Sequence, residues 1–139
     1  MFKKPYDERL RLWRNLRNSL EVSKNPVQKV LDFYKNTVKV RINVDPYTRE
    51  TWPNPWELLY DNTYCEFCIL LGIYYTLKLT DRFSHSHFEI HITQDKQNSQ
   101  SRYLLMMDGT VIEHDKIIAK NGLSSSIEIE KRYVLPALH

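Results

Sequence analysis

The feature that most constrains the fold is a run of apolar residues in the middle of the chain. Residues 64–79 follow a helix-start signal, in which Thr63 and Glu66 have the spacing of a capping box. The helix that follows is apolar on nearly every side, and not along one stripe alone. Such a helix must be covered by other elements, so we expect it to form the centre of the fold. Its apolar residues are Phe67, Cys68, Ile69, Leu70, Leu71, Ile73, Tyr74 and Leu77.

Three further helices are predicted before this central helix. Residues 6–21 carry leucine and tryptophan at helical spacing, with arginines between them. Asn25 and Pro26 then indicate an N-cap followed by a proline in the first turn of a second helix. A short third helix is expected to begin after Asn54, which has the same cap-and-proline pattern.

Alternating apolar and polar residues predict the strands. Residues 38–44 and residues 87–93 both have the period of a half-buried strand. Asp108 and Gly109 form a strong signal for a two-residue turn between two paired strands. The remaining strands are expected at residues 102–107, 110–113 and 127–133.

Helices first and antiparallel strands afterwards predict an α+β fold, in which N-terminal helices and a central apolar helix pack on an antiparallel sheet. The 139 residues, 42% of them hydrophobic, suit a single domain over residues 1–139. The two cysteines do not form a disulfide framework, which favours a reducing compartment. The first residues lack the apolar run of a signal peptide, and the longest apolar stretch is too short to span a bilayer, so we expect no membrane partner.

Charge is unevenly distributed along the chain. Residues 1–41 contain eleven Lys or Arg and four Asp or Glu, whereas residues 42–139 contain nine and thirteen. A basic helical N-terminal region can bind an acidic protein surface or nucleic acid. The alternative is a solvated helix face, which is common where no binding motif accompanies the charge. The candidate contacts are Arg9, Arg11, Arg14 and Arg17.

One arrangement of residues could support thiol chemistry. Cys65 falls in the first turn of the central helix, where unpaired backbone N–H groups and the helix dipole stabilise a thiolate. The next strand carries His87 and His91 on its polar face, and the strand after it ends at Asp108. This order of parts resembles the transglutaminase-like and papain-like cysteine enzymes. The resemblance implies Cys65 as nucleophile, His91 or alternatively His87 as base, and Asp108 as the orienting group.

Structural explanations compete with each of these assignments. Free buried cysteines are mostly inert packing residues, and two histidines on one strand face are more often a solvated row than a site. A zinc set of Cys65, Cys68, His85 and His87 has the right number of ligands, but a single C-x-x-C pair without a neighbouring glycine or proline is a weak signal. We therefore expect no metal and no other cofactor.

A longer part of the chain resembles a family of phage proteins. The most specific segment is Trp-Pro-Asn-Pro-Trp-Glu-Leu at residues 52–58, and the resemblance extends over about residues 6–108. These segments are similar to small proteins encoded by large tailed phages of marine cyanobacteria and related bacteria. The resemblance implies a virion or assembly role, in the host cytoplasm or in the particle. Trp52 and Trp56 would then form a rigid aromatic docking element.

The main functional hypothesis from the sequence is therefore a non-enzymatic phage protein that docks on other proteins, with nucleic acid as a less favoured partner. The first alternative is a cysteine-dependent acyl-transfer or hydrolytic enzyme, and the second is a zinc-binding module. An exposed apolar patch around Trp52 and Trp56 would favour docking. A histidine within hydrogen-bond reach of Cys65 would favour an enzyme.

Overall fold

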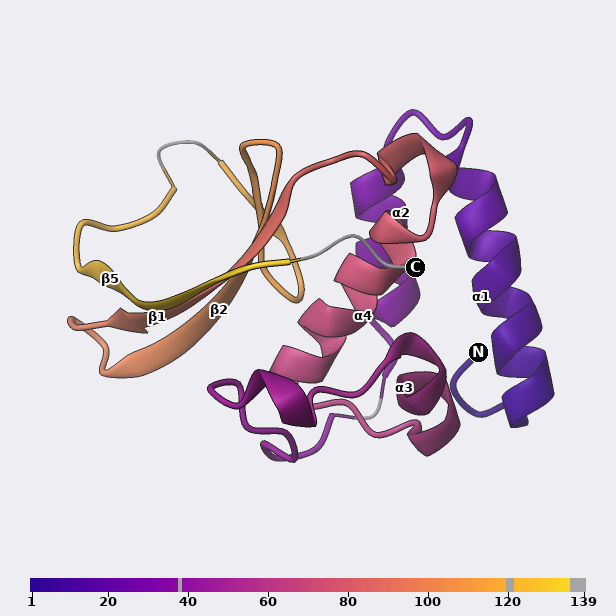
Figure 1. Cartoon of the computed structure of the whole chain (residues 1–139), viewed down its shortest axis with the longest axis horizontal. Helices are drawn as coiled ribbons and strands as arrows, with labels where there is room; N and C mark the ends of the chain where they lie inside the picture. The colour runs from indigo at the N-terminus through magenta and orange to yellow at the C-terminus, as the bar shows by residue number, and fades with distance from the viewer. Residues whose placement is uncertain (38, 120–121, 136–139) are drawn as a thin grey trace.

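The structure, a computed structural model, describes residues 1–37, 39–119 and 122–135, and these form four α-helices and a five-stranded antiparallel sheet. This confirms the predicted α+β class. Figure 1 shows the sheet on one side of the molecule and the helices on the other, with α4 between them. None of the helices in the described ranges is long and apolar enough to cross a membrane. The helices are α1 (Tyr6–Leu20), α2 (Pro26–Tyr34), α3 (Pro55–Asp61) and α4 (Glu66–Lys78), with single 3₁₀ turns at Arg49–Thr51 and Asp81–Phe83.

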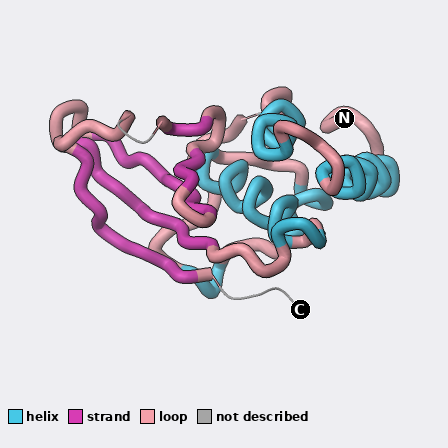
Figure 2. The backbone as a smooth tube through the Cα atoms, turned by 90° about the horizontal axis from the view of Figure 1, so that it is seen from above, coloured by secondary structure: helices cyan, strands magenta, loops and turns pink. Residues whose placement is uncertain are grey.

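Helix α4 is the centre of the core, as its sequence predicts. Every residue from Phe67 to Leu77 is buried. The other helices pack on one side of α4 and strand β2 (Gln100–Met107) on the other, an arrangement that Figure 2 shows from above. Gly72 allows α2 to approach closely, because a Cβ atom at this position would come within 2.9 Å of the Tyr34 ring.

Two helix starts test the capping signals in the sequence. Helix α3 begins as predicted: the Asn54 side chain accepts the N–H of Glu57 at 2.8 Å, and the Glu57 side chain accepts the N–H of Asn54 at 3.1 Å. Helix α4 begins two residues later than expected, with Cys65 as its N-cap. The prediction that Thr63 caps α4 is therefore wrong, and Cys65 lies at the cap position instead of inside the first turn.

The sheet has the strand order β4-β3-β2-β1-β5. The Asp108–Gly109 turn joins β2 to β3 with positive φ angles of 48° and 90°, as two-residue hairpin turns require. Strand β4 is too short to have been predicted from alternation. The bounds are β1 (Phe88–Asp95), β2 as given above, β3 (Thr110–Ile112), β4 (Ile117–Ile118) and β5 (Ile127–Val134).

The prediction of a strand at residues 38–44 is wrong for its described part, and Val38 lies outside the described residues. Lys39 makes a single parallel bridge to Tyr64, and the side chain of Ile42 is exposed. The N–H of Val40 donates to the carbonyl of Tyr64 at 3.1 Å, so this segment runs beside the start of α4 and not beside another strand. The alternation is present, but it has no neighbouring strand to pair with.

Candidate functional site

Cys65 lies at the N-terminus of the central helix beneath residues 39–43, which we call the covering segment. It is fully buried, with 0% of its surface exposed. Two side-chain contacts attach Asn43 of the covering segment to this helix end. Its Nδ2 donates to Thr63 Oγ1 at 3.3 Å, and its Oδ1 accepts from Cys68 Sγ at 3.7 Å. The Cys65 sulfur is therefore shielded from bulk solvent.

The two thiols at this helix end differ in acidity. The Cys68 thiol holds the pKa of Cys65 below its ordinary value of 9.0, burial opposes this, and backbone N–H groups of Asn43, Cys68 and Phe67 reinforce it. The first N–H groups of a helix have no intrahelical acceptor, so they stabilise a thiolate placed at the cap. The pKa of Cys68 is raised, because its thiol donates a hydrogen bond to the Cys65 sulfur and is buried. The first negative charge of the pair therefore forms on Cys65.

A cleft of about 1010 Å³ opens beside Cys65. Its lining comes from residues 39–42 of the covering segment, from the start of α4, from residues 100–103 of β2 and from residues 113–119. This volume lies at the upper end of the range for small-ligand sites, roughly 300–1,000 Å³. The thiol thus adjoins a space that can hold a substrate.

Two residues of this cleft, His114 and Tyr103, were not predicted as site residues from the sequence. The Nε2 atom of His114 lies 3.7 Å from Glu66 Oε1 and 3.8 Å from Asp115 Oδ2, and its side chain is 15% exposed. Burial raises the pKa of Tyr103, and the charge of Cys65 raises it further, so its phenol is protonated at neutral pH. His114 lies two residues after the end of β3, whose last residue, Ile112, pairs with Leu105, and its position behind the Asp-Gly hairpin was the available signal.

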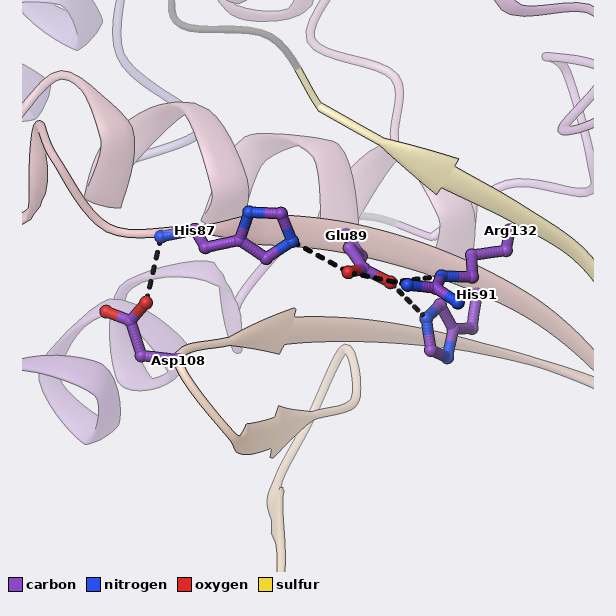
Figure 3. Close-up of polar contacts among 5 residues, drawn as sticks. All are labelled: His87, Glu89, His91, Asp108 and Arg132. Atoms are coloured by element: carbon purple, nitrogen blue, oxygen red, sulfur yellow. Dashed lines mark hydrogen bonds and ion pairs between the residues drawn. The ribbon is translucent and has the colours of Figure 1, made fainter.

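The structure does not bring His91 or Asp108 to Cys65. The apolar residues of β1 face the core, so His91 lies on the opposite face of the sheet. Figure 3 shows His87 and His91 on either side of Glu89, with Nε2–Oε distances of 2.7 and 2.9 Å. Asp108 Oδ1 accepts the backbone N–H of His87 at 2.9 Å, which stabilises the start of the hairpin. The order of Cys65, His91 and Asp108 along the chain fits the predicted triad. However, His91 lies on the face of the sheet that points away from Cys65, so the three side chains do not meet.

Glu89 is the centre of a charged cluster on this outer face. The Arg132 guanidinium donates to both carboxylate oxygens, from Nε at 2.5 Å and from Nη2 at 3.1 Å. Arg132, and then the histidines His91 and His87, hold the pKa of Glu89 well below its ordinary value of 4.5. The histidines therefore have a structural partner that accounts for their position.

This cluster predicts a pH dependence of stability. A carboxylate with a depressed folded-state pKa stabilises the fold above its unfolded value, and this contribution is lost as the pH falls. Glu89→Gln is therefore expected to flatten the decline in unfolding free energy below the ordinary carboxyl pKa of 4.5. Urea unfolding at a series of acidic pH values measures the slope. Glu128→Gln, which removes an exposed pair with Lys96, is the control and should keep the wild-type slope. An unchanged slope in Glu89→Gln would contradict the prediction.

The four ligands of the predicted zinc set do not lie together. The two cysteines are at the start of α4, whereas His85 and His87 follow its end. Thirteen helical residues separate these ends by about 20 Å. Across the described ranges, no group of three or more His, Cys, Asp or Glu is placed to hold a metal ion.

The arginines of α1 do not form one solvated face. Arg9 is only 8% exposed, and its Nε and Nη2 atoms donate to the carbonyl of Leu59 at 2.9 and 2.7 Å. The prediction that Arg9 is available to a partner is therefore wrong, because its guanidinium binds the end of α3. Arg17 stacks over the Trp13 ring at 4.3 Å. The exposed members of the set are Arg11 and Arg14.

The two tryptophans of the predicted docking element point to different environments. Trp52 packs edge-on against Phe67 and Tyr133, with ring centroids 5.1 and 4.8 Å apart. Trp56 is 51% exposed, and Tyr60, one turn further along α3, is 68% exposed. Trp52 thus joins α4 to the sheet, whereas Trp56 and Tyr60 form an exposed aromatic pair on α3.

Comparison with solved structures finds this fold in LapG of Legionella pneumophila. A calcium-bound LapG structure matches with a TM-score of 0.69 at 17% sequence identity, covering 91% of this chain and 78% of the LapG chain. A second LapG structure matches with a TM-score of 0.67 at 19% identity, covering 93% and 79%. At these identities the likeness establishes the fold. No protein-family model and no curated protein sequence matches the chain.

These findings correct the main functional hypothesis. The chain shares its fold with LapG, which agrees with the resemblance to cysteine enzymes noted around Cys65 at the level of the fold only. The likeness to LapG, one of whose structures is calcium-bound, speaks against the non-enzymatic docking protein and favours the enzyme alternative. The described residues offer no cluster of carboxylates for a corresponding calcium ion, so we derive no step through calcium. The similarity to phage proteins and the location that it implies stay predictions.

Proposed function

We propose that this protein is a cysteine-dependent enzyme that hydrolyses or transfers an acyl group, with Cys65 as the nucleophile. The observation that carries the proposal is the placement of Cys65 as the N-cap of a buried helix, with contacts that lower its thiol pKa, beside a large cleft. The likeness to LapG supports the proposal at the level of the fold.

The residues around Cys65 suit the steps of acyl transfer. The thiolate attacks a carbonyl carbon and forms a thioester as the amine or alcohol leaves. His114, which lines the cleft beside Glu66, can deliver the proton that the leaving group takes. The Tyr103 phenol and the backbone N–H groups at the start of α4 can donate hydrogen bonds to the oxygen that becomes negative. Water or a second amine then attacks the thioester and releases the acyl group.

The pH dependence of alkylation tests the proposal. Iodoacetamide labelling of the native protein, read site by site by mass spectrometry, is expected to give a midpoint for Cys65 below that of a free cysteine, about 8.5. Cys68 should stay unlabelled while the protein is folded. Because Cys65 is covered, its plateau rate should be lower than that of a free thiol, so the midpoint is the readout. A Cys65 midpoint equal to that of a free cysteine would exclude the activated thiol.

Two histidine variants test whether the histidine that acts in the reaction lies in the cleft or on the outer face of the sheet. Acylation of Cys65 by p-nitrophenyl acetate is followed as nitrophenol release. His114→Ala is expected to slow acylation or thioester breakdown, because it removes the proton donor of the cleft. His91→Ala is the matched control and should leave both rates unchanged, because its ring faces Glu89. The reverse pattern would move the base to the outer face and contradict the assignment.

A further inference from the structure

Strand β2 extends beyond its neighbour β3 and leaves an open sheet edge in the cleft. Strand β1 pairs with β2 along its whole length, from Gln100 to Met107. Strand β3 pairs with β2 only from Leu105 onward. On this side, the described part of the chain supplies no strand for residues 100–104. Four of these residues, 100–103, line the same cleft as Cys65.

The direction of the backbone groups at this edge follows from bonds elsewhere in the sheet. The N–H of Asp108 donates to the carbonyl of His87 at 3.2 Å, so these two residues form a hydrogen-bonded pair between the strands. Hydrogen-bonded and non-bonded pairs alternate along an antiparallel ladder, so the even-numbered residues of β2 point their N–H and C=O groups toward β1. The odd-numbered residues Ser101 and Tyr103 therefore point theirs into the cleft. The pairing of the odd-numbered Leu105 with Ile112 of β3 agrees with this parity.

Exposed side chains from other segments line the same cleft as this edge. The covering segment presents Val40 and Ile42, which are 39% and 67% exposed, and Ile117, which is 43% exposed, lines the cleft as well. Lys39 and Arg41 alternate along the chain with Val40 and Ile42. Neither of these two basic residues has an ion-pair partner within the described ranges.

Two of the four acidic residues that line the cleft, Asp95 and Glu113, are engaged in hydrogen bonds within the protein. Glu113 binds Arg102 through two hydrogen bonds of 3.0 and 2.6 Å, and Asp95 accepts hydrogen bonds from Ser126 and from the loop that follows it. Glu66 and Asp115 lie on either side of His114, at the outer part of the cleft, with side chains that are 54% and 57% exposed. The covering segment therefore presents both apolar contacts and free positive charge to a ligand.

We propose that the cleft binds an extended, carboxylate-bearing polypeptide segment as an additional strand on the edge of β2, paired with Ser101 and Tyr103. This inference rests on the proposed function, because a strand at Tyr103 brings a peptide carbonyl toward Cys65. Main-chain hydrogen bonds to an open sheet edge give affinity, and the side-chain contacts give selectivity. Val40 and Ile42 would contact apolar side chains, and Lys39 and Arg41 would attract acidic ones.

The test uses the Cys65→Ser protein, which cannot form a thioester, and the capped peptide Thr-Asp-Val-Gln-Val-Asp-Thr. Amide hydrogen exchange is read residue by residue by NMR. Saturating peptide is expected to slow exchange at Ser101 and Tyr103 by about tenfold or more, because their free N–H groups gain partners. Exchange at Arg102 and Leu104, which are already bonded to β1, should stay unchanged. A peptide with lysines in place of both aspartates should bind more weakly, and N-methylation of the central peptide amides should abolish the protection.

Three outcomes would overturn the inference: no binding at millimolar peptide, binding with protection elsewhere, or protection that survives N-methylation. Failure of the proposed function is distinguishable, because the alkylation midpoint of Cys65 is measured without peptide. If the peptide slowed exchange at Ser101 and Tyr103 but Cys65 had the alkylation midpoint of a free cysteine, the cleft would be a peptide-binding site and the proposed catalysis would be wrong. If Cys65 had a lowered alkylation midpoint but the peptide did not slow exchange at Ser101 and Tyr103, the proposed enzyme would stand and strand addition would be wrong.

Discussion

Replacing Cys68 by alanine is expected to raise the pKa of the Cys65 thiol by about one unit, which moves the pH at which Cys65 is half ionised upward by the same amount. The Cys68 thiol is the largest of the contacts that lower the pKa of Cys65. Alanine removes this donor and keeps a residue of high helix propensity in the first turn. The alkylation midpoint of Cys65, compared between the wild type and Cys68→Ala, measures the shift.

Cys68→Ser is the matched variant, because its hydroxyl restores a donor at the same position. Its midpoint is expected to stay close to that of the wild type. Cys68 is buried, so both variants also need thermal melts to show that the fold is retained. If Cys68→Ala left the midpoint unchanged in a folded protein, the backbone N–H groups alone would stabilise the thiolate. Cys68 would then be only a packing residue, as free buried cysteines mostly are.

Local signals predicted the elements that depend on local chemistry. The Asn54 capping box starts α3, and the Asp108–Gly109 turn closes the β2–β3 hairpin, because each needs only a few adjacent residues. The alternation at residues 39–44 failed for a different reason. A strand forms only where a neighbouring strand supplies hydrogen bonds, and this segment has the start of α4 beside it instead.

The same distinction applies to the candidate site. Cys65 could be recognised from the sequence because a helix start is a local feature. The partner of the thiol could not be recognised in this way, because it depends on which face of β1 packs on α4. Burial of the apolar residues of β1 sends His91 to the outer face, where it binds Glu89. His114 reaches the cleft through its position behind the Asp-Gly hairpin, which single-strand periodicity does not reveal.

Arg9→Ala is expected to lower the free energy of unfolding by roughly 3 kcal/mol, because it leaves buried carbonyl groups without a donor. The guanidinium donates to the carbonyls of Leu59 and Tyr60, which lie in the last turn of α3, and to the carbonyl of Lys4 at 2.6 Å. The last carbonyls of a helix have no intrahelical partner, so a cationic donor at this end replaces the missing bonds. Urea unfolding followed by tryptophan fluorescence measures the loss.

Arg14→Ala is the matched control on the same helix, because it makes the same chemical change at an exposed position. Its effect should be about 0.5 kcal/mol or less. Equal and small losses in the two variants would contradict the capping role of Arg9. The C-terminal end of α3 leads directly to the N-cap of α4, so loosening it should also expose Cys65 more often. Arg9→Ala is therefore expected to raise the alkylation rate of Cys65 without moving its pH midpoint, whereas Arg14→Ala should change neither.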